Sequence, residues 1–403
     1  MFNQKRNLKY PSLFLICFFI STALFLNSCG RFILKDEGVE NKSIDELSGV
    51  SSARTKIDGL NTVIYELTQT VGSDGLLTGF FVVPSNGISF LLSIFKDDNA
   101  SIWFDSLNDP DGIDILSPSS TPNLYNDATG SVRENGLSKA GFSNVLVPQS
   151  PSFSPKAGTW TFKARPNDRV SLALRTGSTP STSTITIQPY ITATTWSAGD
   201  ISVALILMKR IYSNNGITLT INDTITISDT QYTNVSKTFI NSTTSVLVSH
   251  GVTEGVNLFF IEDYTDSESL GNAAGIPGSM GTANSWNGVL ISLAAHDVSG
   301  STLDAQLLGE TAAHEMGHQL GLFHTTETGG TVFDILNDTA ECLNSNKDFD
   351  RNGKMSAEEC EGYGGDNLMF WTAWNTSSRS AGKKQETLSS HQQHVLKYSP
   401  IAK

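Results

Sequence analysis

The eleven residues from His314 to His324 constrain this chain more than any other segment. They read HEMGHQLGLFH. Because His314 and His318 are four residues apart, a helix would present both imidazoles on one face, where they can bind the same ion. Glu315 would lie about 100° further around that helix, within reach of a water molecule at the ion. Gly321 permits a sharp left-handed end to the helix, after which His324 can return as a third ligand.

This pattern predicts a metal site of the catalytic kind. Three neutral imidazoles with one open coordination position are typical of catalytic zinc, whereas structural zinc sites use four protein ligands. The alternative is an amphipathic helix with surface histidines. With seven histidines among 403 residues, composition alone gives this spacing a chance on the order of 10⁻⁵. We therefore interpret His314, His318 and His324 as zinc ligands and Glu315 as the catalytic residue. The remaining histidines are interpreted as surface or structural residues: His250, His296, His391 and His394.

Strand-like and helix-like segments alternate around this motif. Apolar residues recur at helical spacing over 199–212 and stop at an Asn-Asn-Gly turn. Ser301, with Asp304 three residues later, is typical of the start of the helix that carries the motif and runs to about residue 320. Strands are expected at 184–191, 217–221, 256–261 and 287–292, and a last helix at about 388–399. Together these elements predict an α/β domain over residues 184–403.

Residues 59–183 have a different pattern, in which short β-rich runs are separated by turn residues. Phe80-Phe81-Val82-Val83 ends at Pro84, and the run 88–95 ends at an Asp- and Asn-containing turn. Evenly spaced short strands with turn chemistry between them are typical of a β-sandwich. We expect an all-β, sandwich-like accessory domain here, joined to the α/β domain by a Ser/Thr/Pro linker at 178–183.

The first 29 residues have the features of an export signal. Lys5, Arg6 and Lys9 precede an apolar stretch, and small residues lead into Cys29. A basic segment, a short apolar core and small residues at a cleavage point are typical of a secretory signal. The place of Cys29 resembles the bacterial lipobox, which implies removal of residues 1–28 and lipidation of Cys29. An uncleaved signal anchor is the alternative. The polar segment 29–58 is interpreted as a flexible tether.

Cysteine usage is consistent with export. Of the four cysteines, Cys17 lies in the signal and Cys29 would carry lipid, which leaves Cys342 and Cys360. A single remaining pair in an exported chain predicts a disulfide that closes a short polar loop. Two buried thiols are the alternative.

The charge balance narrows the classes of partner. Lys and Arg number 27 and Asp and Glu 40, for a net charge of −13. This argues against nucleic acid, whose phosphates require a basic surface. No apolar run of 18 residues follows the first 30, which excludes a polytopic membrane protein. We expect membrane association through the N-terminal lipid only.

The motif around the histidines resembles that of the metzincin clan of zinc endopeptidases, HExxHxxGxxH followed by a Met-containing turn. Asp366-Asn367-Leu368-Met369-Phe370-Trp371 is the candidate for that turn, and the resemblance implies that Met369 forms an apolar floor beneath the histidines. Many members carry Tyr two residues after this Met. Trp371 stands in that place, and an indole cannot offer a phenol to an oxyanion.

Within the clan, the pappalysin-type family is the most similar. Thr325 directly follows the third histidine, as in that family. Residues 271–277 and 288–289 are similar to its upper-rim and edge-strand sequences, which implies that the strand near 286–293 is the edge strand that pairs with an extended substrate. Residues 334–339 with Cys342 are similar to its Asp-Thr segment leading to a cysteine. The resemblance covers residues 184–403 and implies a metzincin-like catalytic domain.

An insert at about 340–362 contains a second metal pattern. Residues 348–359 satisfy D-x-[DN]-x-[DN]-G-x₅-E, which is typical of a loop that binds Ca²⁺ through oxygen ligands. The ligands would come from Asp348, Asp350, Asn352, the carbonyl of Lys354, and Glu359. An acidic turn without an ion is the alternative. The flanking segments are too short for a complete helix–loop–helix hand.

These observations predict a zinc endopeptidase that is lipid-anchored in the bacterial cell envelope, at the outer membrane or cell surface, and hydrolyses polypeptides. Zinc would make a water molecule acidic, and Glu315 would act as the general base. One alternative is a surface-anchored binding protein or adhesin on an inactive peptidase scaffold. Another is a zinc amidase acting on peptidoglycan or small amides. An intact Glu315 argues against the first, because a binding module does not need a base.

Overall fold

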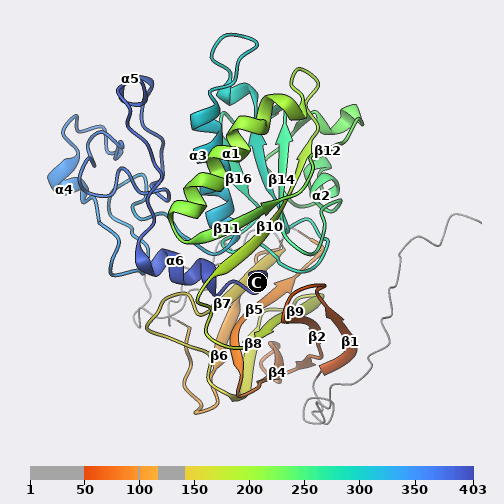
Figure 1. Cartoon of the computed structure of the whole chain (residues 1–403). Helices are drawn as coiled ribbons and strands as arrows, with labels where there is room; N and C mark the ends of the chain where they lie inside the picture. Colours follow the sequence, from red (N-terminus) through yellow and green to blue (C-terminus); the bar gives the residue numbers. More distant parts are fainter. Residues whose placement is uncertain (1–49, 99, 117–140) are drawn as a thin grey trace, which may run out of the picture. The chain divides into compact units, whose positions relative to one another are not determined.

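The structure is a computed structural model that describes residues 50–98, 100–116 and 141–403. Figure 1 draws the chain coloured from the N-terminus to the C-terminus. The proposed signal 1–28, Cys29 and residues 30–49 of the proposed tether lie outside the described residues. Among the described residues, no helix is both long enough and apolar enough to cross a membrane.

The α/β part of the chain is organised around one sheet with strand order β11-β10-β14-β17-β16. Four of its strands run parallel: β10 (Ser183–Ile191), β11 (Ile217–Ile221), β14 (Val256–Ile261) and β17 (Val289–Ser292). The short β12 (Ile225–Thr226) also runs parallel to β10, and the sixth strand, β16 (Gly271–Ala273), pairs antiparallel with β17 at the end of the sheet.

The expectation that residues 286–293 form the edge strand is wrong. Strand β17 lies between β14 and β16, and all four of its residues are buried. The edge is β16, which is only three residues long and rich in small residues. Such a segment has no apolar alternation, so the sequence pattern did not identify it as a strand.

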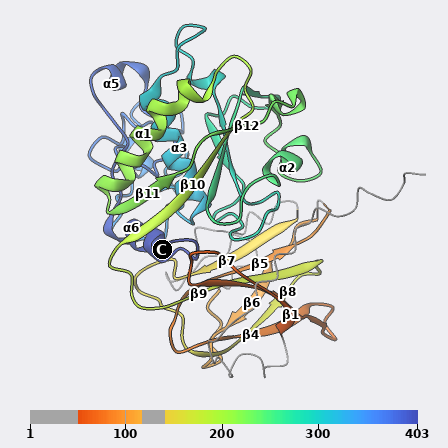
Figure 2. The same ribbon diagram turned by 45° about the vertical axis from the view of Figure 1, so that its right-hand side comes forward.

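Helices cover both faces of this sheet (Figures 1 and 2). Strand β14 alternates between two hydrophobic clusters, because successive side chains of a strand point to opposite faces. Leu258 and Phe260 pack with α1 (Ala198–Asn214) and α3 (Ala305–Gln319). Phe259 and Ile261 pack on the other face with α2 (Thr243–Val248). A strand buried on both faces reads as a continuous apolar run, as expected for a mainly parallel sheet.

The helix that carries the histidine motif begins later than predicted. Its N-cap is Asp304, whose carboxylate accepts the amide proton of Leu307. Ser301 lies instead in the preceding turn, where Asp297 accepts the amide proton of Thr302. Both Ser301 and Asp304 are good N-cap residues, and only the direction of the incoming chain decides between them.

Two antiparallel sheets precede the α/β part. One has the order β1-β2-β9-β5-β7 and the other β3-β4-β8-β6. Phe90 of the first sheet makes edge-on contacts with Phe81 and Trp160 of the second, with ring centroids 5.1 Å apart in both cases. The strands of the first sheet are Val50–Lys56, Thr62–Leu67, Arg169–Thr176, Gly87–Phe95 and Phe142–Val147; those of the second are Thr70–Val71, Leu77–Val83, Gly158–Ala164 and Phe104–Asn108.

The tether prediction was wrong for its last residues, because β1 begins at Val50 and pairs with β2. The segment VSSARTK has no clear apolar alternation. Its backbone pairing with a neighbouring strand, rather than its own composition, makes it a strand.

The last part of the chain contains the insert and the C-terminal helix α6 (Ser390–Lys397). A disulfide joins Cys342 to Cys360, as predicted. The short elements not yet named are β13 (Asn234–Val235), β15 (Asp263–Tyr264), α4 (Asn344–Lys347), α5 (Thr376–Ser380) and two 3₁₀ turns at Thr230–Tyr232 and Ala294–His296.

Candidate metal centre

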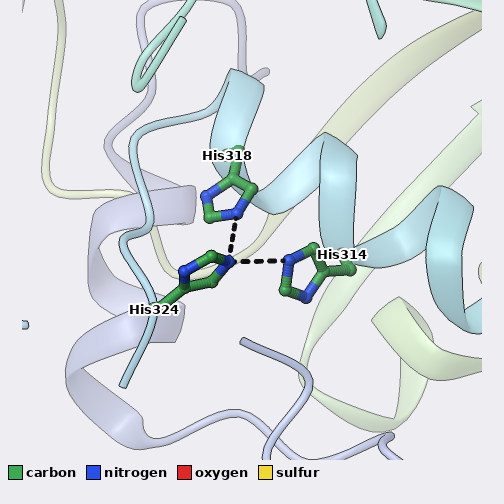
Figure 3. Close-up of side chains that lie close together, drawn as sticks. All are labelled: His314, His318 and His324. Carbon is green, nitrogen blue, oxygen red and sulfur yellow. Dashed lines mark hydrogen bonds between the residues drawn. The ribbon is translucent and has the colours of Figure 1, made fainter. Parts of the chain in front are cut away.

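The three predicted ligands lie together at the C-terminal end of α3 and in the segment that follows it (Figure 3). The Nε2 atom of His324 is 3.2 Å from Nε2 of His314 and 3.0 Å from Nε2 of His318. Nitrogen ligands of a tetrahedral zinc ion, at the usual bond length, are about 3.3 Å apart. The spacing of the three nitrogens therefore fits one ion between them.

The outer nitrogen of each ring is held by an oxygen acceptor. Nδ1 of His314 lies 2.7 Å from the carbonyl oxygen of Leu368, and Nδ1 of His318 lies 2.7 Å from that of Leu322. Carbonyl oxygens only accept, so these two Nδ1 atoms carry protons and the facing Nε2 atoms present lone pairs. Converging lone pairs repel unless a cation lies between them. This donor set is that of a metal site.

Burial keeps the two helical histidines neutral. It lowers the pKa of His314 to about 3 and the pKa of His318 well below its ordinary value. Nδ1 of the third ligand, His324, donates to a carboxylate oxygen of Glu327 at 2.8 Å. Hydrogen bonds of this kind orient metal-bound imidazoles and make them better ligands.

The turn after α3 depends on Gly321. Its φ angle is +107°, a region that disfavours residues with a side chain. A Cβ atom there would also lie 2.7 Å from Leu146 of the preceding β-rich part. The amide of Leu322 then returns a hydrogen bond to the carbonyl of Gly317. This turn reverses the chain tightly enough for His324 to face His318.

Met369 lies directly against the helix between the two helical histidines. It is fully buried, and a Cβ atom added at Gly317 would be 2.5 Å from its Sδ atom. Its carbonyl accepts the amide proton of Thr325, the residue after the third histidine. The thioether thus packs against α3 at Gly317, one residue before His318.

Glu315 lies beneath the edge strand β16. A Cβ atom on Gly271 would lie 2.6 Å from Glu315 Cγ, so any side chain at 271 would displace this carboxylate. Burial, the largest effect, raises the pKa of the Glu315 carboxyl to about 7, while His324, Lys237 and a hydrogen bond from the amide of Ala273 lower it. Glu315 therefore lies next to the histidine cluster and below the free edge of the sheet.

A cleft of about 1000 Å³ contains these groups. His314, Glu315, His318 and His324 line it, together with residues of β16. Trp371 lines it as well, and its indole N–H donates to the carbonyl of Met355 in the insert, 2.5 Å away. Because this indole N–H is already used in a hydrogen bond, it is not available to a substrate.

Several residues that position the site were not identified from the sequence. Glu327 follows the third histidine by three residues, a spacing that could have marked it as its acceptor. The backbone acceptors Leu322 and Leu368 carry no signal in their side chains. Gly271 could have been found only by knowing that β16 lies over α3.

The carboxylates of the second metal pattern, in the insert, lie close together. Carboxylate oxygens of Asp348, Asp350 and Glu359 lie within 4.8 Å of one another. Glu359 accepts the amide protons of Phe349 and Asp350, and Lys354 donates its amide proton to the Asn352 side chain. The loop is thus folded back on itself, with its carboxylates on one side.

The other histidines lie away from the cluster. His296 is buried, with Nδ1 2.6 Å from the carbonyl oxygen of Ser292 and Nε2 2.9 Å from the Thr311 hydroxyl. His391 lies 3.4 Å from Asp338, and the His394 ring stacks on Tyr398. His250 makes an edge-on contact with Tyr232.

Comparison with known proteins identifies a related family for part of the chain. Residues 200–325 match the family model "Metallo-peptidase family M12B Reprolysin-like". This segment includes most of α1, all of α3 and all three histidines. The match supports a metzincin-type zinc peptidase domain here. It does not extend to the preceding β-rich part, so the sandwich-like accessory domain remains a prediction. No curated protein matches the chain.

Two solved structures are similar to the chain at low identity. Archaemetzincin from Archaeoglobus fulgidus, crystallised with malonate, is 11% identical, with 51% of this chain and 96% of that protein covered and a TM-score of 0.28. Metalloproteinase-II from Bacteroides fragilis is 9% identical, with 41% and 56% covered and a TM-score of 0.22.

Proposed function

We propose that this chain is a zinc endopeptidase of the pappalysin-like kind that hydrolyses polypeptides outside the cytoplasm. The observation that carries the proposal is the convergence of three imidazole Nε2 atoms beside a buried carboxylate, under the free edge of a sheet. The match of residues 200–325 to a metallopeptidase family model supports it.

His314, His318 and His324 would hold the zinc ion. When bound there, zinc would polarise the substrate carbonyl and make a water molecule acidic enough to react near neutral pH. Glu315 would take the proton of that water and then give it to the leaving amine. The burial that raises the pKa of Glu315 is suited to a group that must both accept and release a proton.

The edge strand β16 would hold the substrate. Its outer edge is not paired with another strand among the described residues. An extended peptide can add to such an edge through main-chain hydrogen bonds. This mode of binding favours a polypeptide over the small amides of the competing amidase hypothesis.

The decisive experiment uses Glu315→Gln, which removes the base and keeps the shape of the side chain. Purified wild-type chain should cleave an unstructured protein such as casein, while the variant loses at least about 10³-fold in rate. Zinc content should stay at one ion per chain in both. His318→Ala should lose zinc as well as activity. No cleavage by either protein with zinc bound would favour the binding-protein alternative. Equal cleavage by the wild type and Glu315→Gln would rule out Glu315 as the general base.

We also propose that the insert binds one calcium ion through Asp348, Asp350, Asn352, Lys354 and Glu359. The three carboxylates repel one another unless a cation lies between them, and calcium prefers oxygen ligands of this kind. Through Met355 the insert holds Trp371 at the cleft. Calcium should therefore raise both the melting temperature and the activity.

The calcium proposal has its own test at constant zinc. Melting curves of the wild type with and without calcium should differ by several degrees, and Glu359→Gln should lose most of that difference. Glu341→Gln, an exposed change outside the loop, is the control and should retain it. Overlapping curves for the wild type would rule out the calcium site.

We propose further that lipidated Cys29 anchors the chain in a bacterial cell envelope. The sequence around Cys29 is the support for this location. In a bacterial host, the wild-type chain should incorporate a labelled fatty acid and sediment with membranes. Cys29→Ser should lose the label, and retention of the label by that variant would disprove the assignment.

A further inference from the structure

One end of the cleft is formed by aromatic side chains that the proposed mechanism does not use. Phe142, the first residue of β7, lines the same cleft as Glu315 and His318. Its ring stacks on Trp286, with centroids 5.0 Å apart and an interplanar angle of 12°. Phe239 stacks on Trp286 as well, at 6.2 Å. This end of the cleft is therefore an aromatic wall made of Phe142, Phe239 and Trp286.

The aromatic wall lies toward the C-terminal end of α3. There Gln319 accepts the amide proton of Gly278 and donates to the carbonyl of Ser279. The amide of Ser279 in turn donates to the carbonyl of Trp286 at 2.7 Å. The opposite end of the cleft is lined by Leu307, about 18 Å from Gln319 along the helix at 1.5 Å per residue. The reaction centre therefore lies between two separate ends of the cleft.

One face of β7 fixes the aromatic wall to the metal centre. Phe142, Asn144 and Leu146 share a face, because every second residue of a strand points the same way. The Asn144 amide donates to the carbonyl of Pro277 at 2.5 Å. Leu146 packs against Gly321, in the turn that leads to the third histidine. The β-rich part thus contributes a wall of the cleft and supports the turn of the metal site.

The wall has the properties of a subsite for an apolar side chain. Its three rings line the cleft and are at least nine-tenths buried, so they do not protrude into solvent. Ile276, half-buried, also lines this end of the cleft. Residues 274–276 continue from the end of β16, so a peptide paired with that strand would pass over the wall. Aromatic pairs contribute attraction beyond the area they bury.

We propose that the aromatic wall binds a bulky apolar, preferably aromatic, side chain of the polypeptide substrate, on one side of the scissile bond. The β-rich part is then a component of the substrate-binding site. This inference rests on the proposed peptidase function and specifies the substrate class for it.

The test measures binding and cleavage with a set of peptides. Each is an Ala- and Gly-rich decamer with a single Phe, placed at successive positions on either side of the scissile bond. Binding is measured by calorimetry on zinc-loaded Glu315→Ala chain, so that no peptide is cleaved. At one position, on one side only, Phe should bind about tenfold more tightly than Ala, with the same ratio in kcat/KM for the wild type.

Variants of the wall should change that ratio. Phe142→Ala should reduce the preference for Phe from about tenfold to below about threefold. Trp286→Leu should have the same effect and provides a second variant if Phe142→Ala does not fold. Phe81→Ala is the matched control, because Phe81 is equally buried between the two antiparallel sheets and does not line the cleft. It should retain the preference.

The outcomes separate this inference from the function on which it rests. If no peptide or protein is bound or cleaved, the proposed function fails and the inference fails with it. If peptides are cleaved but Phe has no favoured position, the inference alone is overturned. It is also overturned if Trp286→Leu retains the full preference, or if Phe81→Ala loses it.

Discussion

At the scale of single residues, the metal centre is fixed by the hydrogen bonds behind the ligands as much as by the ligands themselves. Each histidine faces the cluster with Nε2 because its Nδ1 atom is held by Leu368, Leu322 or Glu327. Two of these acceptors are backbone carbonyls, which mutation of their own side chains does not remove. Glu327 is the acceptor that a single substitution can test.

Gly271 sets the position of the catalytic carboxylate. Gly271→Ala would place a methyl group 2.6 Å from Glu315 Cγ, so Glu315 must move. A displacement of about 1 Å of a catalytic group costs about 10²-fold in rate. We expect kcat/KM to fall by about this factor, with zinc content and melting temperature close to those of the wild type. Full activity in the variant would show that the base tolerates the shift. Ser202→Ala, on the exposed side of α1, is the control substitution.

At the scale of elements, α3 combines structural and chemical roles along one helix. Its N-terminal half packs on α1 at Gly309, and the Tyr212 hydroxyl of α1 donates to the carbonyl of Ala313 at 2.8 Å. Its C-terminal half carries the ligands, with Met369 packed against Gly317. Anything that shifts this helix therefore moves two zinc ligands and the base together.

His296 ties α3 to the end of β17 and makes the stability of this region dependent on pH. Burial, the largest effect, lowers its pKa from 6.5 to about 4, while Asp304 raises it and Arg379 lowers it further. Above pH 6.5 the ring is neutral in both folded and unfolded chains. Between pH 6.5 and 4 only the unfolded chain binds the proton, so stability falls as the pH falls. The largest loss from this group is about 3 kcal/mol.

This pH dependence can be isolated by substitution. In zinc-free protein, the unfolding free energy of His296→Gln should vary less between pH 6.5 and 4 than that of the wild type. Taking the difference between the two proteins cancels the contributions of the other histidines. His391→Gln, with its ring near the surface, should retain the wild-type slope. Identical slopes for wild type and His296→Gln would contradict the prediction.

At the scale of the whole molecule, the β-rich and α/β parts are joined by specific polar contacts. Arg175 of β9 is buried, and its guanidinium donates to the carbonyl oxygens of Lys397 and Ser399 at 2.7 and 3.0 Å. These carbonyls lie at the C-terminal end of α6, where a positive charge is favourable. The chain end also pairs with the start of β10, through Lys403 and Thr184.

Arg175→Met should therefore destabilise both parts together. The substitution keeps the length of the side chain but removes the guanidinium donor of the Lys397 carbonyl and leaves the Ser399 carbonyl with only the amide of Ala402, at a cost of about 2 kcal/mol. Urea unfolding should show a lower midpoint in a single transition. Lys209→Met, which removes one exposed cation from α1, should have little effect. An unchanged midpoint for Arg175→Met would show that this contact does not hold the two parts together.

Some features of this protein are determined by the local sequence alone. Helical periodicity places His314, Glu315 and His318 on neighbouring faces, and a glycine at 321 permits the turn to His324. These relations hold over fewer than twelve residues, so backbone geometry is enough to predict them. The pairing of Cys342 with Cys360 was predictable because they are the only two cysteines left after Cys17 in the proposed signal and Cys29, the proposed lipidation site, are set aside. The apolar runs of β10, β14 and β17 identified the core strands for the same reason.

The tertiary structure decided what depends on segments far apart in the chain. Which strand forms the edge depends on strand order, so β16 and not β17 lies over Glu315. The backbone acceptor at Leu368 is 54 residues from the histidine that it orients. Phe142 reaches the cleft only because β7 packs on the turn at Gly321. Such contacts form only when the whole core packs, because the local sequence of each element does not specify which other element it will contact.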